Sequence, residues 1–254
     1  APTYKPEISF IDDNDGNGKL SKAEIGNDGK TEAKITVPSN AEVGDSIVYT
    51  VNGGEEKTEK ITQDIKDNGF KVEVPVTDGQ KATVTAKVVD PAGNAGDKSE
   101  ASIDVDTSAP TGTTIDSITD NVGNGVDANG NPIVEDIDLN NGGLTNDNTP
   151  TINGSAEPGS KVVVSIDGKP VNENGKPVDV SKGEKPYEVE VGQDGKWTFT
   201  PKEPLPDGKH EISVVAKDEA GNEGDPVKSN IEIDTSAPTY KPEISFIDDN
   251  DGNG

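Results

Sequence analysis

Short runs of alternating apolar and polar residues dominate the chain, a pattern typical of β-strands with one face on a core and one in water. In the first 108 residues these runs predict strands near 6–12, 32–37, 46–51, 58–63, 69–76, 81–89 and 99–105. In the next 128 residues they predict strands near 112–119, 149–154, 160–167, 186–192, 195–200, 209–217 and 227–233. Asn-Gly and Asp-Gly turn sequences separate several of them. Helical periodicity is nearly absent, so each part predicts an immunoglobulin-like sandwich of seven strands.

The sequence also repeats itself. Residues 1–18 recur unchanged at 237–254, and the segment Asp106-Thr-Ser-Ala-Pro-Thr111 returns 128 positions later, from Asp234. Such self-similarity is typical of an array of units in a line. We therefore predict an all-β fold of tandem immunoglobulin-like Greek-key β-sandwich modules arranged end to end. The predicted domains are module 1 at 1–108, module 2 with insertions at 109–236, and the start of a further repeat at 237–254.

Residues 13–24 match the template of a twelve-residue calcium loop. The template positions are filled by Asp13, Asp15, Asn17, Gly18, Lys19 and Glu24. Three side chains supply oxygens at positions 1, 3 and 5, the Lys19 carbonyl serves at position 7, and Glu24 offers two oxygens at position 12. Gly18 lies where the sharp turn needs a residue without a Cβ. Calcium is the first hypothesis and a plain acidic turn is the alternative. The preceding residues predict a strand, so the loop would be inserted in a β fold.

Composition strengthens the case for bound cations. The formal net charge is −26 and only 28% of residues are hydrophobic, values that border on those of disordered chains. Bound Ca²⁺ would neutralise part of this charge, and the acidity argues against nucleic acid or an anionic membrane surface as a partner. The chain has no Cys, so disulfides and thiolate chemistry are excluded. No apolar stretch is long enough for membrane insertion. The absence of Met and the repeated beginning predict a piece of a longer chain.

The expected strand order brings further acidic residues together. The first and last strands of a sandwich end at the same side, and the loop between the last two strands of module 2 should meet the linker from module 1. We therefore predict an interdomain calcium cluster that consists of Asp12, Asp104, Asp106, Asp218 and Asn222. By the same logic Asp120 and Asp234 would meet at the far end of module 2. Asp90 is the counterpart of Asp218 in module 1 and a further candidate ligand. The alternative is that Asp90 and Asp218 only begin turns.

A weaker calcium candidate follows the first strand of module 2. Positions 1, 3, 5 and 12 of a loop would be filled by Asp127, Asn129, Asn131 and Asp138. Pro132, however, occupies the place reserved for Gly. A plain turn rich in Asn and Gly is therefore the preferred interpretation.

Little in the sequence predicts an enzyme. Carboxylates are plentiful but fall in loops and linkers, without a converging acid, base or nucleophile. Trp197, the only Trp, alternates with Phe199 and is predicted to be core and not a ligand platform. His210, the only His, has no second His or Cys to work with and is predicted to be structural or solvent-exposed.

Several motifs resemble those of a known family. They are Asp-Asp-Asn-Asp-Gly-Asn-Gly at 12–18, Asp-Pro-Ala-Gly-Asn at 90–94, Asp-Glu-Ala-Gly-Asn at 218–222, Asp-Thr-Ser-Ala-Pro at 106–110 and 234–238, and Leu-Thr-Asn-Asp-Asn-Thr-Pro-Thr-Ile-Asn-Gly at 144–154. Nearly the whole chain resembles the extender region of giant bacterial surface adhesins, the biofilm-associated-protein and repeats-in-toxin (RTX) group with tandem bacterial Ig-like domains. The 168–185 insertion and the incomplete calcium template after Asp120 depart from that pattern.

The resemblance implies a role. Such proteins leave the cell by type I secretion and hold an adhesive tip away from the bacterial cell surface on a calcium-stiffened stalk, for attachment and biofilm formation. The implied partners are neighbouring repeats of the same chain, arranged as a monomeric rod. The alternative is an Ig-like module that itself binds a glycan, a host surface or identical repeats on another cell. An exposed aromatic platform would favour a glycan ligand, and the sequence offers few aromatic residues for one.

Overall fold

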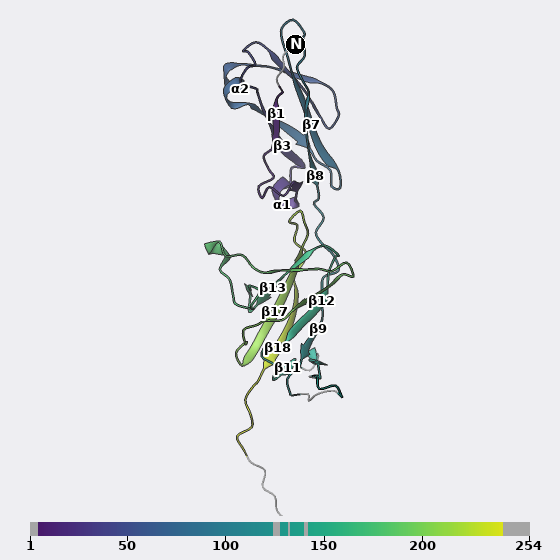
Figure 1. The fold of residues 1–254 in the computed structure, drawn as a ribbon, viewed down its shortest axis with the longest axis vertical. Helices are drawn as coiled ribbons and strands as arrows, with labels where there is room; N and C mark the ends of the chain where they lie inside the picture. Colours follow the sequence, from purple (N-terminus) through teal and green to yellow (C-terminus); the bar gives the residue numbers. More distant parts are fainter. Residues whose placement is uncertain (1–4, 124–127, 132, 140–141, 241–254) are drawn as a thin grey trace, which may run out of the picture.

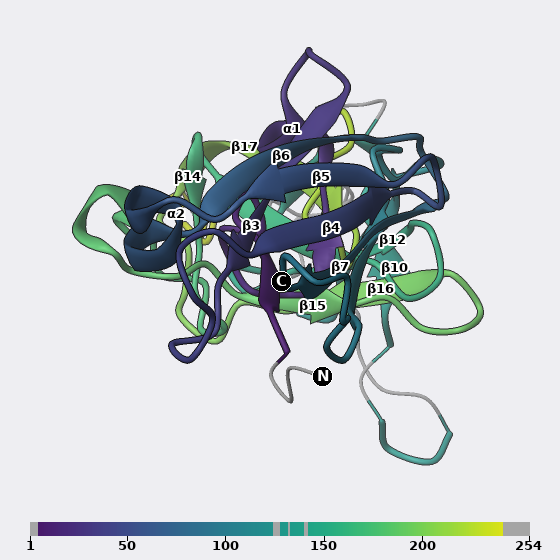
Figure 2. The same ribbon diagram turned by 90° about the horizontal axis from the view of Figure 1, so that it is seen from above.

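Two β-sandwich modules lie end to end along the long axis of the molecule (Figure 1). The structure, a computed structural model of the chain, describes residues 5–123, 128–131, 133–139 and 142–240. Figure 2 looks along the same axis and shows the strands of module 1 in front of those of module 2. The predicted all-β fold of tandem Ig-like sandwiches is confirmed for this part of the chain. Most of the predicted further repeat, residues 241–254, lies outside it.

Module 1 packs two sheets against each other. Its elements are β1 (Glu7–Phe10), β2 (Lys19–Leu20), α1 (Lys22–Ile25), β3 (Lys30–Thr36), β4 (Ser46–Val51), β5 (Lys57–Lys60), α2 (Gln63–Asn68), β6 (Phe70–Pro75), β7 (Lys81–Val89) and β8 (Ser99–Val105). One sheet has the order β1-β3-β6 and the other the order β2-β8-β7-β4-β5. The helix α1 lies at the end of module 1 that faces module 2 (Figure 1).

Module 2 repeats this plan with additions. Its elements are β9 (Thr114–Asp120), β10 (Glu135–Asp136), β11 (Leu144–Thr145), β12 (Thr151–Ser155), β13 (Lys161–Ile166), β14 (Lys169–Pro170), the 3₁₀ helix η2 (Val180–Lys182), β15 (Glu188–Glu190), β16 (Lys196–Phe199), β17 (Gly208–Lys217) and β18 (Val227–Ile233). The sheets have the orders β10-β9-β12-β16 and β11-β18-β17-β13-β14, and β15 also pairs with β13. The loop between β17 and β18 points toward α1 of module 1 (Figure 1).

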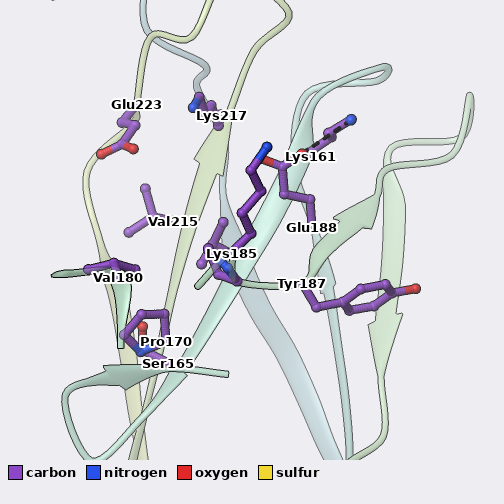
Figure 3. A pocket seen from close by; sticks show the side chains of 12 residues that line it. Lys161, Ser165, Pro170, Val180, Lys185, Tyr187, Glu188, Val215, Lys217 and Glu223 are labelled. Atoms are coloured by element: carbon purple, nitrogen blue, oxygen red, sulfur yellow. Dashed lines mark hydrogen bonds and ion pairs between the residues drawn. The ribbon is translucent and has the colours of Figure 1, made fainter. Parts of the chain in front are cut away.

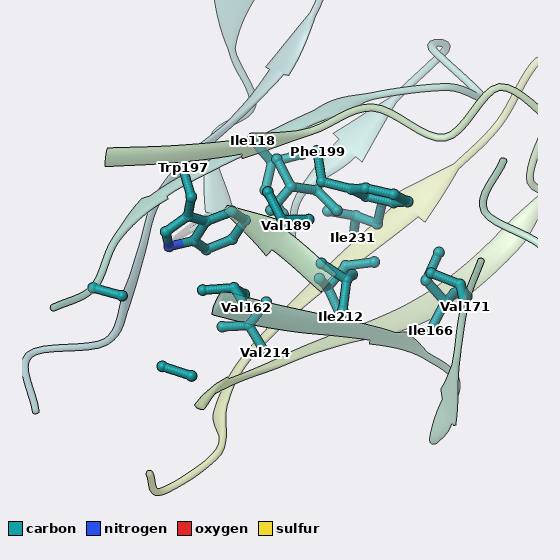
Figure 4. Close-up of a cluster of buried hydrophobic side chains, with 14 of the residues drawn as sticks. Ile118, Val162, Ile166, Val171, Val189, Trp197, Phe199, Ile212, Val214 and Ile231 are labelled. Carbon is teal, nitrogen blue, oxygen red and sulfur yellow. The ribbon is translucent and has the colours of Figure 1, made fainter. Parts of the chain in front are cut away.

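Each module has its own hydrophobic core, because alternate residues of its strands point inward. In module 2, Trp197 and Phe199 of β16 pack on valines and isoleucines of β13 and β17 (Figure 4). Trp197 is 4% exposed, which confirms its predicted core position. Gly154 lies opposite Trp197 in the register of β12 and β16. A Cβ added there would come 2.3 Å from the indole, so only glycine leaves room for the ring.

The predicted strands are all present, and the differences lie between them. After β5, where a strand was predicted to continue to residue 63, the chain forms α2. Thr62 accepts a hydrogen bond from the Ile65 amide and so caps this helix, a role in which Thr is favoured. The two-residue strands β2 and β11 were not predicted, because two residues cannot establish an alternation. Each runs parallel to the last strand of its module, with Leu20 opposite Val105 and Thr145 opposite Ile233.

Candidate metal centre at the module junction

Loop 13–24, which follows β1 and ends within helix α1, gathers three carboxylates. Side-chain oxygens of Asp13, Asp15 and Glu24 lie within 4.8 Å of one another. In the described part of the chain, no other group of three or more His, Cys, Asp or Glu side chains is as close. Asp13 Oδ1 is buried and has no hydrogen-bond partner in the structure. A buried anionic oxygen without a partner is costly, so this donor set fits a hard cation such as Ca²⁺.

The backbone of the loop turns its amides toward side-chain oxygens of Asp13, Asp15 and Asn17. The amide of Gly18 donates to Asp13 Oδ2 at 3.2 Å, and the amide of Asn17 donates to Asp15 Oδ1 at 3.0 Å. The amide of Lys19 donates to Asn17 Oδ1 at 2.8 Å. Gly18 has φ +80°, a conformation that other residues rarely adopt. The sequence therefore builds a tight turn around the oxygens that the calcium template names.

Glu24 joins the two ends of the loop. Its Oε1 accepts from the Asn14 amide at 3.0 Å, and its Oε2 accepts from the Ser21 amide at 2.9 Å and the Ser21 hydroxyl at 2.8 Å. Ser21 and Glu24 thereby form a capping box at the start of α1. The Ser-x-x-Glu spacing of residues 21–24 could have revealed this cap from the sequence. Glu24 thus has a structural role besides its predicted one as a ligand.

The same loop forms half of the contact between the modules. Asn17 Nδ2 donates to the Glu219 carbonyl at 3.2 Å, and Lys19 Nζ lies 2.7 Å from Glu219 Oε2. The first helical amide, that of Lys22, donates to Asn222 Oδ1 at 2.8 Å. The hydrogen bond to Glu219 raises the pKa of Lys19 and lowers that of Glu219. Both side chains are partly or largely exposed, so solvent screens the pair and it contributes little to stability.

Asn222 is the most fully bonded residue of this contact. Its side-chain amide donates to the Asp106 carbonyl and to Asp218 Oδ2, each at 2.8 Å, and its own amide donates to Asp218 Oδ1 at 2.8 Å. The residue is only 6% exposed. A nearby cavity of about 380 Å³ is lined by Asp15, Asn17, Gly159, Lys161, Glu188, Lys217, Asp218, Glu219 and Gly221. Asn222 therefore ties the linker, its own loop and α1 together.

The predicted interdomain cluster is only partly assembled. Asn222 does meet the linker at Asp106, but through the carbonyl of Asp106 and not its carboxylate, and Asp218 is joined to this contact only through Asn222. Asp12 Oδ2 instead accepts from the Thr31 hydroxyl at 2.9 Å and the Glu32 amide at 2.8 Å.

Asp104 likewise has a partner of its own, since its Oδ1 lies 2.7 Å from Lys81 Nζ. The strand β2 explains part of the difference, because it puts Lys19 opposite Asp104, where Asp12 was expected. Among the described residues these carboxylates do not form a group close enough for an ion. A calcium ion shared across the linker stays a prediction.

Thr145 connects the two acidic residues predicted to meet at the far end of module 2. Its hydroxyl donates to Asp120 Oδ2 at 2.7 Å, and its carbonyl accepts from the Asp234 amide at 2.9 Å. Asp147, which sequence reasoning missed, is fully buried beside them. Its Oδ1 accepts from the Thr149 amide at 2.8 Å and its Oδ2 from the Asn121 amide at 3.3 Å.

The weaker calcium candidate in module 2 is not tested as a whole. Asp127 lies outside the described residues. Asn129, Asn131 and Asp138 lie within them, and each takes part in interactions of its own.

Asp90 begins a turn, and its predicted role as a calcium ligand stays a prediction. Its Oδ1 accepts from the amides of Ala92 at 2.9 Å and Asn94 at 2.8 Å, and its Oδ2 accepts from Asn94 Nδ2 at 2.8 Å. The side-chain hydrogen bond from Asn94, with the backbone amides, holds the pKa of Asp90 below its usual value.

A second candidate surface is a depression of about 730 Å³ on module 2 between β13, β17 and the segment 180–188 (Figure 3). Lysines and glutamates share its lining, and Lys161 is paired with Glu188 at 3.2 Å. The ring of Tyr187 points away from the depression in Figure 3 and packs on Phe199 with centroids 6.4 Å apart. The depression therefore has side chains of both charges in its lining, and the ring face of Tyr187 does not form part of its floor.

His210 is buried and held on both ring nitrogens. Its Nδ1 lies 2.8 Å from Asp167 Oδ2 and its Nε2 lies 2.8 Å from the Pro206 carbonyl. It is therefore a structural residue of module 2, one of the two roles predicted for it.

Comparison with known proteins agrees with this fold class. Residues 137–235, less than half of the chain, match the family described as Bacterial Ig-like domain. The chain is similar to the fibronectin(III)-like modules of Clostridium thermocellum CbhA, at 14% identity and a TM-score of 0.49, covering 94% of this chain and 100% of that chain. It is also similar to a two-domain fibronectin type-III segment of chicken tenascin, at 11% identity and a TM-score of 0.24, covering 80% and 91%. No curated protein sequence matches it.

The chain is thus built from tandem Ig-like β-sandwich modules, and the matched part of module 2 is similar to those of bacteria. Folds of this class serve mostly as non-catalytic structural or adhesive units. No described helix has the length and apolar character that a membrane span requires.

Proposed function

We propose that this chain is a calcium-stiffened extender segment of a bacterial surface adhesin. It lies outside the cell and projects a distal adhesive region for attachment and biofilm formation. One observation carries the proposal: the loop that gathers Asp13, Asp15 and Glu24 around a buried oxygen without a partner is also the loop that contacts module 2.

Calcium would be held by Asp13, Asp15, Asn17 and Glu24 with the Lys19 carbonyl, the groups that the loop template names. When bound, the ion supplies positive charge among carboxylates that otherwise repel one another. A loop fixed in this way holds Asn17, Lys19 and the start of α1 in place against Glu219 and Asn222. Bending between the modules would then break these contacts, because the fixed loop cannot move with module 2. The two modules would therefore behave as a rod.

Calcium would also control folding. An extracellular site of this kind binds at roughly 10⁻⁴–10⁻³ M. At ten times its dissociation constant, a site that binds only the folded state adds about 1.4 kcal/mol of stability. Domains of this size have marginal stability of about 5–15 kcal/mol, so a few sites matter. At the low free calcium concentration inside a cell, the acidic modules would remain largely unfolded. In that state they could be exported by type I secretion.

The alternative, a module that itself binds a glycan or a host surface, has less support. The depression between β13, β17 and the segment 180–188 is lined by lysines and glutamates beside apolar residues, and Tyr187 turns its ring away from it. The proposed role therefore rests on the junction and not on this surface.

Small-angle scattering and thermal melting, each in calcium and in excess chelator, test the proposal. We expect the wild-type chain to be elongated and to melt higher in calcium, and to become more flexible in chelator. Asp13→Asn should lose most of this response, and in chelator it should melt at least as high as the wild type because one repelling charge is gone.

Asp28→Asn is the matched control, because Asp28 is an exposed carboxylate whose Oδ1 accepts from the Lys30 amide outside the template. This variant should respond to calcium like the wild type. Equal shape and equal melting temperature of the wild type in the two conditions would reject the calcium mechanism.

A further inference from the structure

The C-terminal ends of the two modules share one framework. In module 1 the Asp106 amide donates to the Leu20 carbonyl at 3.0 Å, and in module 2 the Asp234 amide donates to the Thr145 carbonyl at 2.9 Å. Because β2 and β11 pair in the same way with the last strands, Lys19 and Leu144 hold equivalent positions, opposite Asp104 and Glu232.

The linkers that leave the two modules are also held alike. In module 1 the hydroxyls of Thr107 and Ser108 donate to Asp78, and in module 2 those of Thr235 and Ser236 donate to Asp207. The linker therefore leaves both modules with the same hydrogen bonds, so a module that follows either one would meet the same backbone arrangement.

The loops at the opposite ends of the modules share a second framework. Asp90 and Asn94 bond their backbones at 3.0 Å, and Asp218 and Asn222 do so at 3.1 Å. The side-chain amides of Asn94 and Asn222 both donate to the Asp that begins the turn, at 2.8 Å. The surroundings of the two Asn residues differ, since Asn222 is buried against module 1 and Asn94 is exposed. The Asn94 loop is thus a docking loop without a module against it.

Two positions of the contact carry different residues in the two modules. Where one is charged at the existing junction its partner is charged, and at the other end of each module both are apolar. At the existing junction Lys19 is charged and lies 2.7 Å from the carboxylate of Glu219. The position equivalent to Lys19 is Leu144, which is 65% exposed. The position equivalent to Glu219 is Pro91, which is exposed as well. At the existing junction a charged residue therefore meets a charged one. Leu144 and Pro91, which have no partner module in this chain, are both apolar.

We propose that module 2 docks onto a following copy of module 1 through a second junction, in which Leu144 contacts Pro91 and the Asn94 amide takes the place of Asn222. The order of modules is then set by matched pairs. Lys19 opposite Pro91 would lose the ion pair that it makes with Glu219, and Leu144 opposite Glu219 would set an apolar side chain against a carboxylate. Residues 237–254 repeat the first 18 residues of module 1, which identifies the partner as that module.

This inference rests on the tandem-array part of the proposed function and is independent of calcium. The test chain consists of residues 1–254 followed by residues 19–236, which continue the repeat without a break. Since the chain has no Cys, spin labels can be placed on Lys209→Cys of the first module 2 and Lys57→Cys of the second module 1. Electron–electron distance measurements then report the second junction, in calcium and in chelator.

The unmodified chain should give a narrow distance distribution in calcium. Leu144→Lys in the first module 2 should broaden it, and so should Pro91→Glu in the second module 1. The two changes together should narrow it again, because they recreate the Lys19–Glu219 pair. Leu144→Lys in the last module 2, which has no module after it, is the matched control and should change nothing.

Two results would overturn the inference: a distribution that is broad without any substitution in both conditions, or one that Leu144→Lys leaves narrow. A distribution that is narrow in both calcium and chelator would instead count against calcium stiffening and leave the paired junction intact. The melting of module 2, followed by the fluorescence of Trp197, should be the same in all variants because Leu144 is exposed.

Discussion

Gly154 shows how one missing side chain shapes the core of module 2. A Cβ at this position would lie 2.3 Å from the Trp197 ring and 2.2 Å from the Thr114 carbonyl oxygen. Neither the indole nor the neighbouring strand can move away without disturbing the sheet. We expect Gly154→Ala to destabilise module 2 by at least the roughly 1–3 kcal/mol typical of overpacked cores. Because Trp197 is the only Trp, its fluorescence during urea unfolding reports this module alone.

The control for this prediction is Thr198→Ala, whose side chain is exposed on the strand beside Gly154. It should change the unfolding midpoint much less. An unchanged midpoint in Gly154→Ala would mean that β12 and β16 can separate more easily than the structure implies.

Asp78 provides a test of pH dependence at a single residue. Its carboxylate accepts from the Thr107 amide at 2.5 Å and from the Ser108 and Thr107 hydroxyls, and these hydrogen bonds lower its pKa. A pKa that is lower in the folded state contributes stability that is present above about pH 4 and is lost as the pH falls through the folded value. We expect an NMR titration to give Asp78 a pKa below that of an ordinary Asp, with the Thr107 amide resonance moving at the same pH.

Asp207 holds the linker of module 2 in the same manner, and its pKa is lowered chiefly by the Thr235 side chain. It should titrate in parallel with Asp78. In Asp78→Asn the acid-induced shift of the Thr107 amide should disappear while that of Thr235 remains. An ordinary pKa for both carboxylates would contradict the described linker geometry.

For single residues, the sequence predicted which carboxylates of the loop lie close together but not the hydrogen-bond partners of the other acidic residues. Asp13, Asp15 and Glu24 could be grouped in advance because a calcium loop fixes their spacing within twelve residues. Asp12 and Asp104 could not, because their partners, Thr31 and Lys81, come from other strands. Such contacts depend on strand register, which alternation alone does not give.

Helix α1 joins the loop to module 2, because its Lys22 amide donates to Asn222. It has a single turn, so its capping box contributes much of its stability. Ser21→Ala removes the hydroxyl that bonds Glu24, which should cost about 1 kcal/mol. We expect faster hydrogen exchange at the Lys22 amide, which donates to Asn222, and a lower unfolding midpoint for module 1.

Ser21→Thr keeps a capping hydroxyl and serves as the control. It should restore slow exchange at the Lys22 amide. Fast exchange in both variants would point to a steric effect at this buried position and not to the cap.

The elements that could be predicted are those long enough to show a period. Strands such as β7 and β17 alternate over nine and ten residues and lie where the pattern placed them. The short elements α2, β2 and β11 are set by a cap or by pairing with a distant strand. Their local sequence carries too few residues to establish a pattern.

In the molecule as a whole, the Asn222 side chain makes the buried part of the contact between the modules. Asn222 donates to the Asp106 carbonyl and accepts from the Lys22 amide, so it bonds to module 1 at two places. Asn222→Asp loses a donor and sets a second carboxylate beside Asp218, and each lost buried hydrogen bond costs about 1–3 kcal/mol. We expect distance distributions between spin labels on the two modules to broaden.

Asn94→Asp is the matched control, because Asn94 has the same internal hydrogen bonds but is exposed. It should disturb its own loop and leave the distance between the modules unchanged. Equal broadening in both variants would indicate a general effect of added charge. No broadening in either would show that Asn222 does not govern the junction.

If the proposed second junction forms, the pairing of Lys19 with Glu219 and of Leu144 with Pro91 limits how a gene for such an array can change its length. A recombination event that deleted one module would bring Lys19 opposite Pro91, or Leu144 opposite Glu219. An event that deleted or added 236 residues, the interval at which the sequence repeats, would leave every partner in place. Copy number should therefore vary by pairs of modules, and the shortest heritable step in the length of the protein is two sandwiches.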